Sequence, residues 1–395
     1  MPGIAGPRPK FLIFSVDTEP DDARWEGLKD GPWSHENLSG LPELQRRLNA
    51  LGARATYLIS HSVAEQGRLE ATLAADLASG ACEAGTHFHP GDTPPFAKAM
   101  TKAGTAGYGN GKWQGKGRGK GRSAGDNILR QPADILEAKF AALHALITAR
   151  FGKPASHRAG AWALDARVTA LLVRYGYRVD SSVTPGVSWK RNGRPSYLAA
   201  PMSAYPLGSG DPAAPAYPDD SAGPGTQGNV RDTGILEVPV SIWSPRRWNG
   251  TWAGAIFGDI LTMPLAARGG LAVRLVRALR PAPPRWLRPA FMEAAEMIEV
   301  ADRLEADGAD YLHVMCHSNE LWPGTSPYCR NREELDRFYA RLEGLLKTAL
   351  ERGYRPVTLA GYAAELRKGN QSGIGSGNNA AGTGGPQGIA GFRAG

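Results

Sequence analysis

Short apolar runs alternate with amphipathic segments along most of this 395-residue chain, and this alternation limits the folds open to it. The clearest runs of strand length are Phe11–Val16, Ala55–Ile59, Cys82–Phe88 and Tyr311–Met315. Segments with the apolar spacing of a helix lie between such runs. Regular strand–helix alternation favours a mostly parallel sheet, and about seven such units favour closure of that sheet. We therefore predict an α/β protein with a distorted (β/α) barrel.

Low-complexity segments interrupt and flank this pattern. We expect one barrel domain over residues 11–366, between a short N-terminal segment (1–10) and a disordered glycine-rich tail (367–395). Inside the barrel we expect a Gly/Lys-rich insertion (98–126) and a Pro/Gly-rich insertion (203–233). The wider stretch 186–234, rich in Pro, Gly, Ser and Asp, is predicted to be irregular.

The basic character of the chain comes from one of these insertions. The net charge is +8, and the stretch from Phe96 to Ser123 contributes seven basic residues and no acidic one. A Gly/Lys-rich composition buries too little apolar surface to order itself, so we expect a mobile, solvated loop. Contact with an anionic surface through this loop is the alternative, and nucleic acid is not the expected partner.

Cysteine usage and hydropathy indicate where such a chain works. The three cysteines, Cys82, Cys316 and Cys329, have no regular spacing, which argues against a disulfide framework and a cysteine zinc site. The N-terminus lacks a long apolar run, and we identify neither a signal peptide nor a membrane span. A cytoplasmic protein with reduced thiols is expected.

Two pairs of polar residues follow predicted strands at the same two-residue spacing. Asp17 and Glu19 end the first strand, and His87 and His89 end the third. Residues two apart on an extended chain point to the same side. Two carboxylates on one side repel each other unless a cation lies between them, and two imidazoles can bind one metal. A solvated turn and two unrelated loop histidines are the alternative readings.

Further reactive side chains follow later strands. Arg158 and Trp162 lie after one strand, Asp180 ends the next, and His317 ends a late apolar strand. Because chemistry in a parallel barrel gathers at the carboxyl ends of its strands, these residues could surround one site. His313 lies within its strand, and we interpret it as a core histidine with satisfied hydrogen bonds.

Five motifs in order resemble the NodB-homology polysaccharide deacetylases (carbohydrate esterase family four). They are Val16–Glu19, Gly85–Pro90, Arg158–Trp162, Asp180–Ser182 and Met315–Asn319. The phrases THFHPGDTPP, HRAGAW and CHSNEL look closest to the WalW-like branch. The resemblance spans residues 11–366 outside the insertions. It implies a distorted barrel and removal of acyl groups from amino sugars with a divalent metal.

The resemblance also implies roles for single residues. Asp17 would be the general base, oriented by Arg158, and His317 the general acid, paired with Asp180. Glu19 and His87 would bind the metal, while Met315 and Trp162 would contact the substrate. The family usually has Asp in place of Glu19 and spaces its histidines H-x-x-x-H. Since position 91 is Gly91, the remaining ligand is His89, Asp92 or water, and we expect His89.

The expected chemistry is hydrolysis of an N-acyl group, acetyl in the first instance, on an amino sugar or polysaccharide. Zn²⁺ is the expected metal, with Co²⁺, Ni²⁺ or Mn²⁺ as alternatives. It would polarise the carbonyl and activate a water, whose proton Asp17 would take. One alternative is hydrolysis of another non-peptide C–N bond, in a small amide, ureide or cyclic imide. Another is a non-catalytic anion-binding protein that uses the basic loop. The oligomeric state stays open.

Overall fold

The computed structural model describes residues 9–21, 34–96, 108–109, 112–113, 127–216, 232–243 and 284–374. Every structural statement below concerns these residues. Most of the basic insertion (98–126), half of the Pro/Gly-rich insertion (203–233), and the chain beyond Ile374 lie outside them. Within the basic insertion, two-residue strands β4 (Tyr108–Gly109) and β5 (Lys112–Trp113) pair antiparallel.

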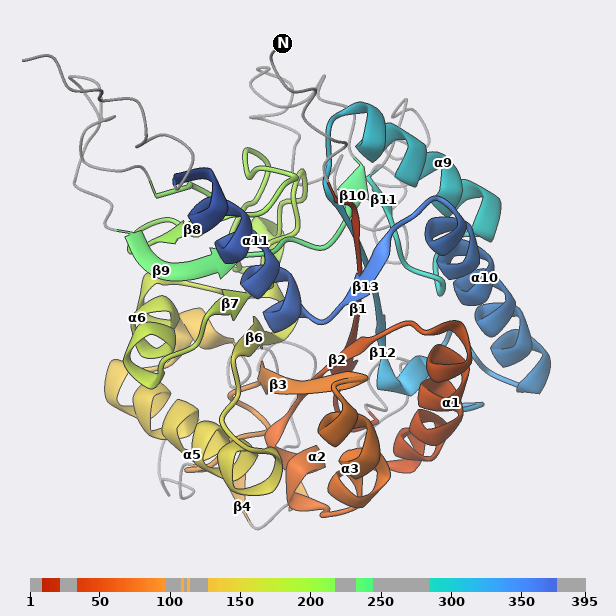
Figure 1. Cartoon of the computed structure of the whole chain (residues 1–395). Coiled ribbons are helices and arrows are strands. Elements are labelled where there is room, and N and C mark those ends of the chain that lie inside the picture. The colour runs from red at the N-terminus through yellow and green to blue at the C-terminus, as the bar shows by residue number, and fades with distance from the viewer. Residues whose placement is uncertain are drawn as a thin grey trace, which may run out of the picture.

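A mostly parallel nine-stranded sheet curls into a half-barrel at the centre of the molecule (Figure 1). The strand order is β12-β1-β2-β3-β6-β7-β9-β8. On the edge of β1 opposite β12, β13 pairs with the first part of β1 and β2 pairs with the rest. Within the described strands of this sheet, only the β8–β9 pair is antiparallel. The predicted distorted (β/α) barrel is confirmed. The strands are β1 (Phe11–Thr18), β2 (Ala55–Ile59), β3 (Cys82–Phe88), β6 (Ser156–Ala159), β7 (Val179–Asp180), β8 (Tyr205–Gly208), β9 (Asp232–Glu237), β12 (Tyr311–His317) and β13 (Arg355–Val357).

Irregular backbone spans the gap between the two ends of the curled sheet. Just beyond β9, the Val238 N–H donates to the Asp180 carbonyl at 2.8 Å. Three residues later, the Ser241 N–H donates to the carbonyl of His313 in β12 at 3.1 Å. The chain after β9 therefore crosses from β7 to β12. Here a small antiparallel pair, β10 (Ile242–Trp243) and β11 (Arg285–Trp286), lies beside the main sheet.

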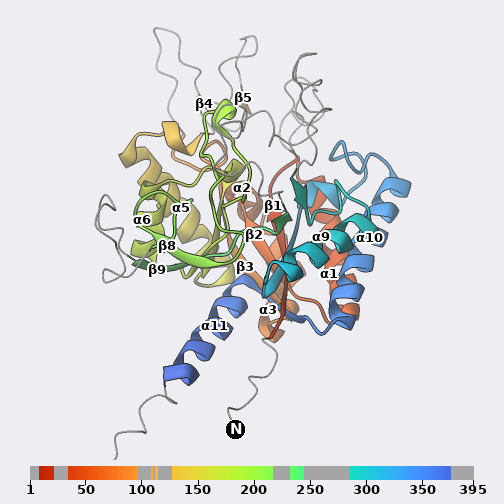
Figure 2. The same cartoon turned by 90° about the horizontal axis from the view of Figure 1, so that it is seen from above.

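Helices cover the outer face of the sheet, and one helix closes the end opposite the site (Figures 1 and 2). The larger apolar core lies between the sheet and the outer helices. A smaller core inside the barrel is closed by residues of α11, whose Ala360 N–H donates to the partly buried Glu83 carboxylate at 3.0 Å. The helices are α1 (Leu41–Leu51), α2 (His61–Glu65), α3 (Leu69–Ser79), α5 (Ala133–Phe151), α6 (Ala166–Tyr175), α9 (Ala294–Ala306), α10 (Arg332–Glu351) and α11 (Leu359–Ile374).

Most predicted elements are confirmed, and the exceptions have local causes. The segment between β2 and β3 forms two helices, α2 and α3, because Gly67 adopts a left-handed φ of 68° between them. The stretch 186–234, predicted as irregular, contains β8, and α11 extends into the expected tail as far as Ile374. Among the described helices, none has the length and apolar character needed to cross a membrane.

Candidate active site

Alternation along β1 and β12 sorts the barrel interior into layers. The register pairs Ile13 with His313 and Asp17 with His317, so equivalent positions lie side by side. Ile13 belongs to the apolar inner core. Two residues on, Ser15 donates or accepts a 2.8 Å hydrogen bond with His313 Nε2. Two further on, Asp17 reaches the open end of the strands. Along β1 the barrel interior thus changes from an apolar layer at Ile13, through a polar layer at Ser15 and His313, to the site at Asp17.

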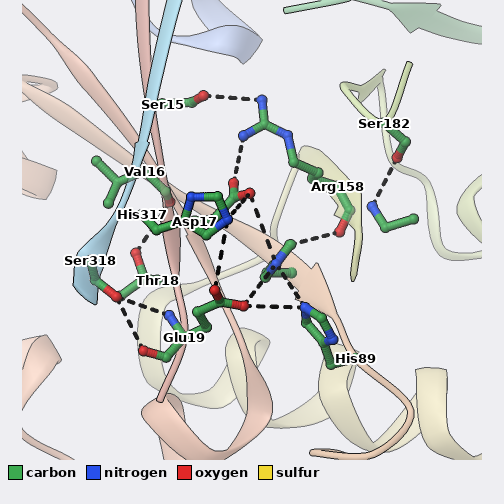
Figure 3. Close-up of polar contacts among 12 residues, drawn as sticks. Ser15, Val16, Asp17, Thr18, Glu19, His89, Arg158, Ser182, His317 and Ser318 are labelled. Atoms are coloured by element: carbon green, nitrogen blue, oxygen red, sulfur yellow. Dashed lines mark hydrogen bonds and ion pairs between the residues drawn. The ribbon is translucent and has the colours of Figure 1, made fainter. Parts of the chain in front are cut away.

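Arg158 occupies the polar layer and is completely buried. Its Nη1 bonds Asp17 Oδ1 at 2.5 Å, and its Nη2 donates to Ser15 Oγ at 3.0 Å (Figure 3). Its Nε and Nη2 also donate to the carbonyl and hydroxyl of Ser181, at 2.7 and 2.8 Å. A guanidinium with this many fixed partners holds the Asp17 carboxylate in one orientation. The contact expected between Arg158 and Asp17 is present.

His313 is a core histidine, as the sequence indicates. It is fully buried, and its Nδ1 lies 3.2 Å from the Pro239 carbonyl. Burial and the nearby Arg158 charge lower the pKa of His313 to about 3, so the ring is neutral. It braces the polar layer and does not belong to the site above.

Glu19, His87 and His89 converge at the carboxyl ends of β1 and β3. Figure 3 shows Glu19 facing His89. Glu19 Oε2 lies 3.6 Å from His87 Nε2 and 3.3 Å from His89 Nε2, and the two nitrogens are 3.1 Å apart. Two ligands of a tetrahedral zinc ion, each about 2.1 Å from it, are about 3.4 Å from each other. The three donor atoms therefore have the separations and chemistry that such an ion needs.

Neighbouring groups prepare two of these side chains for binding a cation. His87 Nδ1 lies 3.2 Å from the Arg158 carbonyl, which can only accept, so Nδ1 carries the proton and Nε2 offers a lone pair. The Glu19 backbone is held on both sides by Ser318, whose Oγ bonds the Glu19 N–H and carbonyl at 3.1 Å each. Asn37 donates to the same carbonyl at 2.7 Å.

Glycine is required where His89 packs against the next strand. A Cβ on Gly160 would lie 2.7 Å from three atoms of the His89 ring. The turn after Gly160 is strained, because Ala161 and Trp162 both have left-handed φ values, 55° and 61°. The other candidate ligand, Asp92, lies elsewhere and accepts from the Ser62 N–H at 3.1 Å.

The two carboxylates at the end of β1 are both held in the ionised form. Burial would raise the pKa of Asp17, but the positive charge of the neighbouring Arg158 guanidinium favours the ionised carboxylate and leaves the pKa below its usual value. Burial also opposes ionisation of Glu19, yet its close contacts with His87 and His89 hold its pKa well below the usual range.

His317 faces the two carboxylates from the end of β12. Its Nε2 lies 3.7 Å from both Asp17 Oδ2 and Glu19 Oε1 (Figure 3). On the other side of the ring, Nδ1 lies 2.8 Å from Arg288 Nη2 and 3.6 Å from Glu320 Oε1. The sequence analysis missed both of these partners. Glu320 follows His317 by three residues, and that spacing was the available signal.

The expected pairing of Asp180 with His317 is wrong. Asp180 accepts from the backbone N–H and hydroxyl of Ser182, at 3.0 and 2.9 Å, and it lies against Glu237 on the neighbouring strand β9. The register of β3, β6 and β7 aligns Asp180 with His157 and Thr86, one residue before the level of His87, and this places Asp180 below the site. Burial and the Asp180 charge raise the pKa of Glu237 well above its usual value, which favours its protonated form.

Trp162 and Met315 lie in one apolar cluster beside the polar layer. Trp162 is 8% exposed and Met315 1%. The Arg158 guanidinium lies 5.2 Å from the centre of the Trp162 ring, and Trp286 meets that ring edge-on at 5.7 Å. This geometry places both residues in the packing around Arg158.

Comparisons with known proteins match the chain through its fold only. No family model and no curated protein matches it. Matching solved structures include a candidate polysaccharide deacetylase from Mycobacterium smegmatis, with 12% identity, a TM-score of 0.46, and coverage of 93% of this chain and 94% of that one. The peptidoglycan deacetylase PdaC from Bacillus subtilis has 10% identity, a TM-score of 0.33, and coverage of 93% and 96%.

A 4-alpha-glucanotransferase from Thermococcus litoralis also matches, with 10% identity and a TM-score of 0.39 over 91% of this chain and 38% of that one. At these identities and TM-scores the likenesses specify no activity. The argument about function therefore depends on the residues of this chain.

Proposed function

We propose that this protein is a metal-dependent hydrolase that removes an N-acyl group, acetyl in the first instance, from an amino sugar or polysaccharide. The observation that carries the proposal is the convergence of Glu19, His87 and His89 beside an ionised Asp17. A divalent metal, zinc in the first instance, is the expected partner of those three donors. When bound, such an ion supplies Lewis acidity to an amide carbonyl and acidifies water.

Asp17 is the proposed base. Its Oδ1 is occupied by Arg158, which leaves Oδ2 directed between His87 Nε2 at 4.0 Å and His317 Nε2 at 3.7 Å. A proton acceptor must be ionised and within reach of the attacking water, and Arg158 favours the ionised form. Arg158 therefore orients the base and keeps it ready.

His317 is proposed to donate into the site from the end of β12. Its Nε2 lies 3.7 Å from both Asp17 Oδ2 and Glu19 Oε1, where a departing amine or a developing oxyanion needs a donor. Asp180 has no proposed part in this, since it bonds Ser182. Glu320 and Arg288 are the groups against the other ring nitrogen.

The proposal is tested by measuring release of acetate from N-acetylglucosamine oligomers by protein supplied with Zn²⁺. The Asp17→Asn variant is the inactive reference, and an exposed-site variant, Asp232→Asn, is the matched control. Small amides, ureides and cyclic imides are assayed in parallel. Turnover of the oligomers that needs both metal and Asp17 supports the proposal. Turnover of only the small compounds would favour the alternative C–N hydrolase.

A further inference from the structure

The two nitrogens of His317 have different surroundings, and one of them has an unusual partner. Nδ1 lies 2.8 Å from Arg288 Nη2. A guanidinium carries only donors, so a hydrogen bond at this distance requires Nδ1 to accept. An imidazole whose Nδ1 accepts can carry its single proton only on Nε2. The partner chosen for Nδ1 therefore determines what Nε2 presents to the site.

We propose that Arg288 fixes His317 in the tautomer with the proton on Nε2, directed at the space between Asp17 and Glu19. This inference rests on the proposed function and deepens it. In this tautomer Nε2 has no lone pair to offer, so His317 is kept from acting as a ligand although it lies 3.7 Å from Glu19. It is instead a hydrogen-bond donor to the reacting group.

The surroundings of Arg288 hold its guanidinium in place. The backbone on either side of Leu287 is tied to neighbouring segments, because its N–H donates to Ser241 and its carbonyl accepts from Met315. Arg288 is almost fully buried, and its Nη2 also pairs with the fully buried Glu320 carboxylate. Its guanidinium carbon lies 4.2 Å from the centre of the Phe291 ring. Arg288 is thus a positioning residue, which acts through His317.

In this tautomer, His317 is not the acid that gives a proton to the leaving amine, contrary to the expectation from the sequence. An uncharged ring that lost its Nε2 proton would become an anionic imidazolate. We therefore assign the proton transfer to Asp17. Its carboxylate takes a proton from the attacking water as the new C–O bond forms. The same proton then passes to the amine nitrogen as the C–N bond breaks. His317 donates a hydrogen bond throughout and ends the cycle unchanged.

The direct test is ¹⁵N NMR of protein labelled at histidine, recorded near pH 8.5, above the ordinary histidine range. The chain has eight histidines, and the signals lost in His317→Gln identify the ring of interest. We expect an unprotonated Nδ1 and a protonated Nε2 in the wild type. In Arg288→Met the Glu320 carboxylate becomes the partner of Nδ1, and Nδ1 should become protonated.

Controls separate this effect from general disturbance. Arg288→Lys keeps a cationic donor and should keep Nδ1 unprotonated, which preserves the test if Arg288→Met does not fold. Arg285→Met changes a partly exposed arginine three residues away, paired with Glu299, and should leave the His317 signals unchanged. A protonated Nδ1 in the wild type, or an unprotonated one in folded Arg288→Met, would overturn the inference. Neither of these two NMR results depends on enzymatic activity, so either can be distinguished from failure of the proposed function.

If the protein releases acetate at a measurable rate, kinetics provide a second test of the donor role of His317. His317→Gln retains an amide N–H donor, whereas His317→Ala does not. We expect kcat for N-acetylglucosamine oligomers to fall about 10–100-fold less in the Gln variant than in the Ala variant, with similar KM values. Equal loss in both variants would contradict a donor role and return His317 to the role of proton-donating acid.

Discussion

The ends of β3 and β12 both direct a histidine Nε2 at the same space, yet the opposite ring nitrogens meet opposite partners. His87 Nδ1 faces the Arg158 carbonyl, which only accepts, and His317 Nδ1 faces the Arg288 guanidinium, which only donates. The first arrangement leaves a lone pair on Nε2 and the second leaves a proton there. Two histidines in one site are thereby prepared as a ligand and as a donor.

The largest expected effect comes from Asp17, which lies between the two histidines. Asp17→Asn keeps the shape of the side chain and removes the base, so turnover should fall by about 10²–10⁴-fold. Metal content should stay near that of the wild type, because Asp17 is not among the three convergent donors. Acetate release and metal analysis on the same samples check both parts. Loss of metal together with activity would show that Asp17 is itself a metal ligand.

Arg158 supports both sides, through its side chain to Asp17 and through its carbonyl to His87. Arg158→Met keeps the carbonyl but leaves the Asp17 charge buried without its partner. We expect the free energy of unfolding to fall by about 3–5 kcal/mol, measured by urea denaturation. Arg174→Met, which breaks an exposed pair with Glu137, should cost less than about 1 kcal/mol. Similar losses in the two variants would show that the Arg158–Asp17 pair contributes no more to the free energy of unfolding than an exposed ion pair.

Gly160 offers a change confined to the β3 side. Gly160→Ala places a methyl group 2.7 Å from the His89 ring, which must move. Metal affinity should weaken by about tenfold, as for other groups that orient a ligand. The His317 signals should not change. Gly344→Ala in α10, where a Cβ meets only Ala294, is the control. Competition with a chromogenic chelator measures the affinity, and an unchanged value would remove His89 from the set of ligands.

Glu237 offers a change that should touch neither histidine. Its folded pKa is raised, so it contributes stability below the ordinary glutamate pKa and loses that contribution as pH rises through the folded value. Glu237→Gln mimics the protonated form. Relative to the wild type, it should gain stability between pH 5 and pH 8 in urea denaturation, and the exposed-site variant Glu351→Gln should not. A difference independent of pH would refute the raised pKa of Glu237.

Much of the fold follows from local sequence signals. The bounds of β2, β3 and α1 follow directly from their apolar patterns and, for α1, from Gly52 with its left-handed φ of 67°. The closing backbone after β9 could not be predicted, because Val238 and Ser241 bond strands that are distant in sequence. The short strand β8 was missed for a similar reason, since only pairing with β9 distinguishes it from a loop.

The site divides in the same way. Two-residue spacing at strand ends predicted the convergence of Glu19, His87 and His89, because alternation and parallel pairing act locally. The partner of His317 was not predictable from the motifs. It depends on where the segment around Leu287 lies along β12, and that placement comes from tertiary contacts. Asp180 was placed wrongly because the register that aligns it with His157 and Thr86 is a property of the folded sheet.

Metal content tests the central claim most directly. Wild type, His87→Ala and His317→Ala, each equilibrated with Zn²⁺ and desalted, are compared by inductively coupled plasma mass spectrometry. A ligand at the end of β3 and a donor at the end of β12 predict close to one equivalent of zinc in the wild type and in His317→Ala, and almost none in His87→Ala. Equal zinc in all three proteins, or loss in His317→Ala alone, would contradict the account.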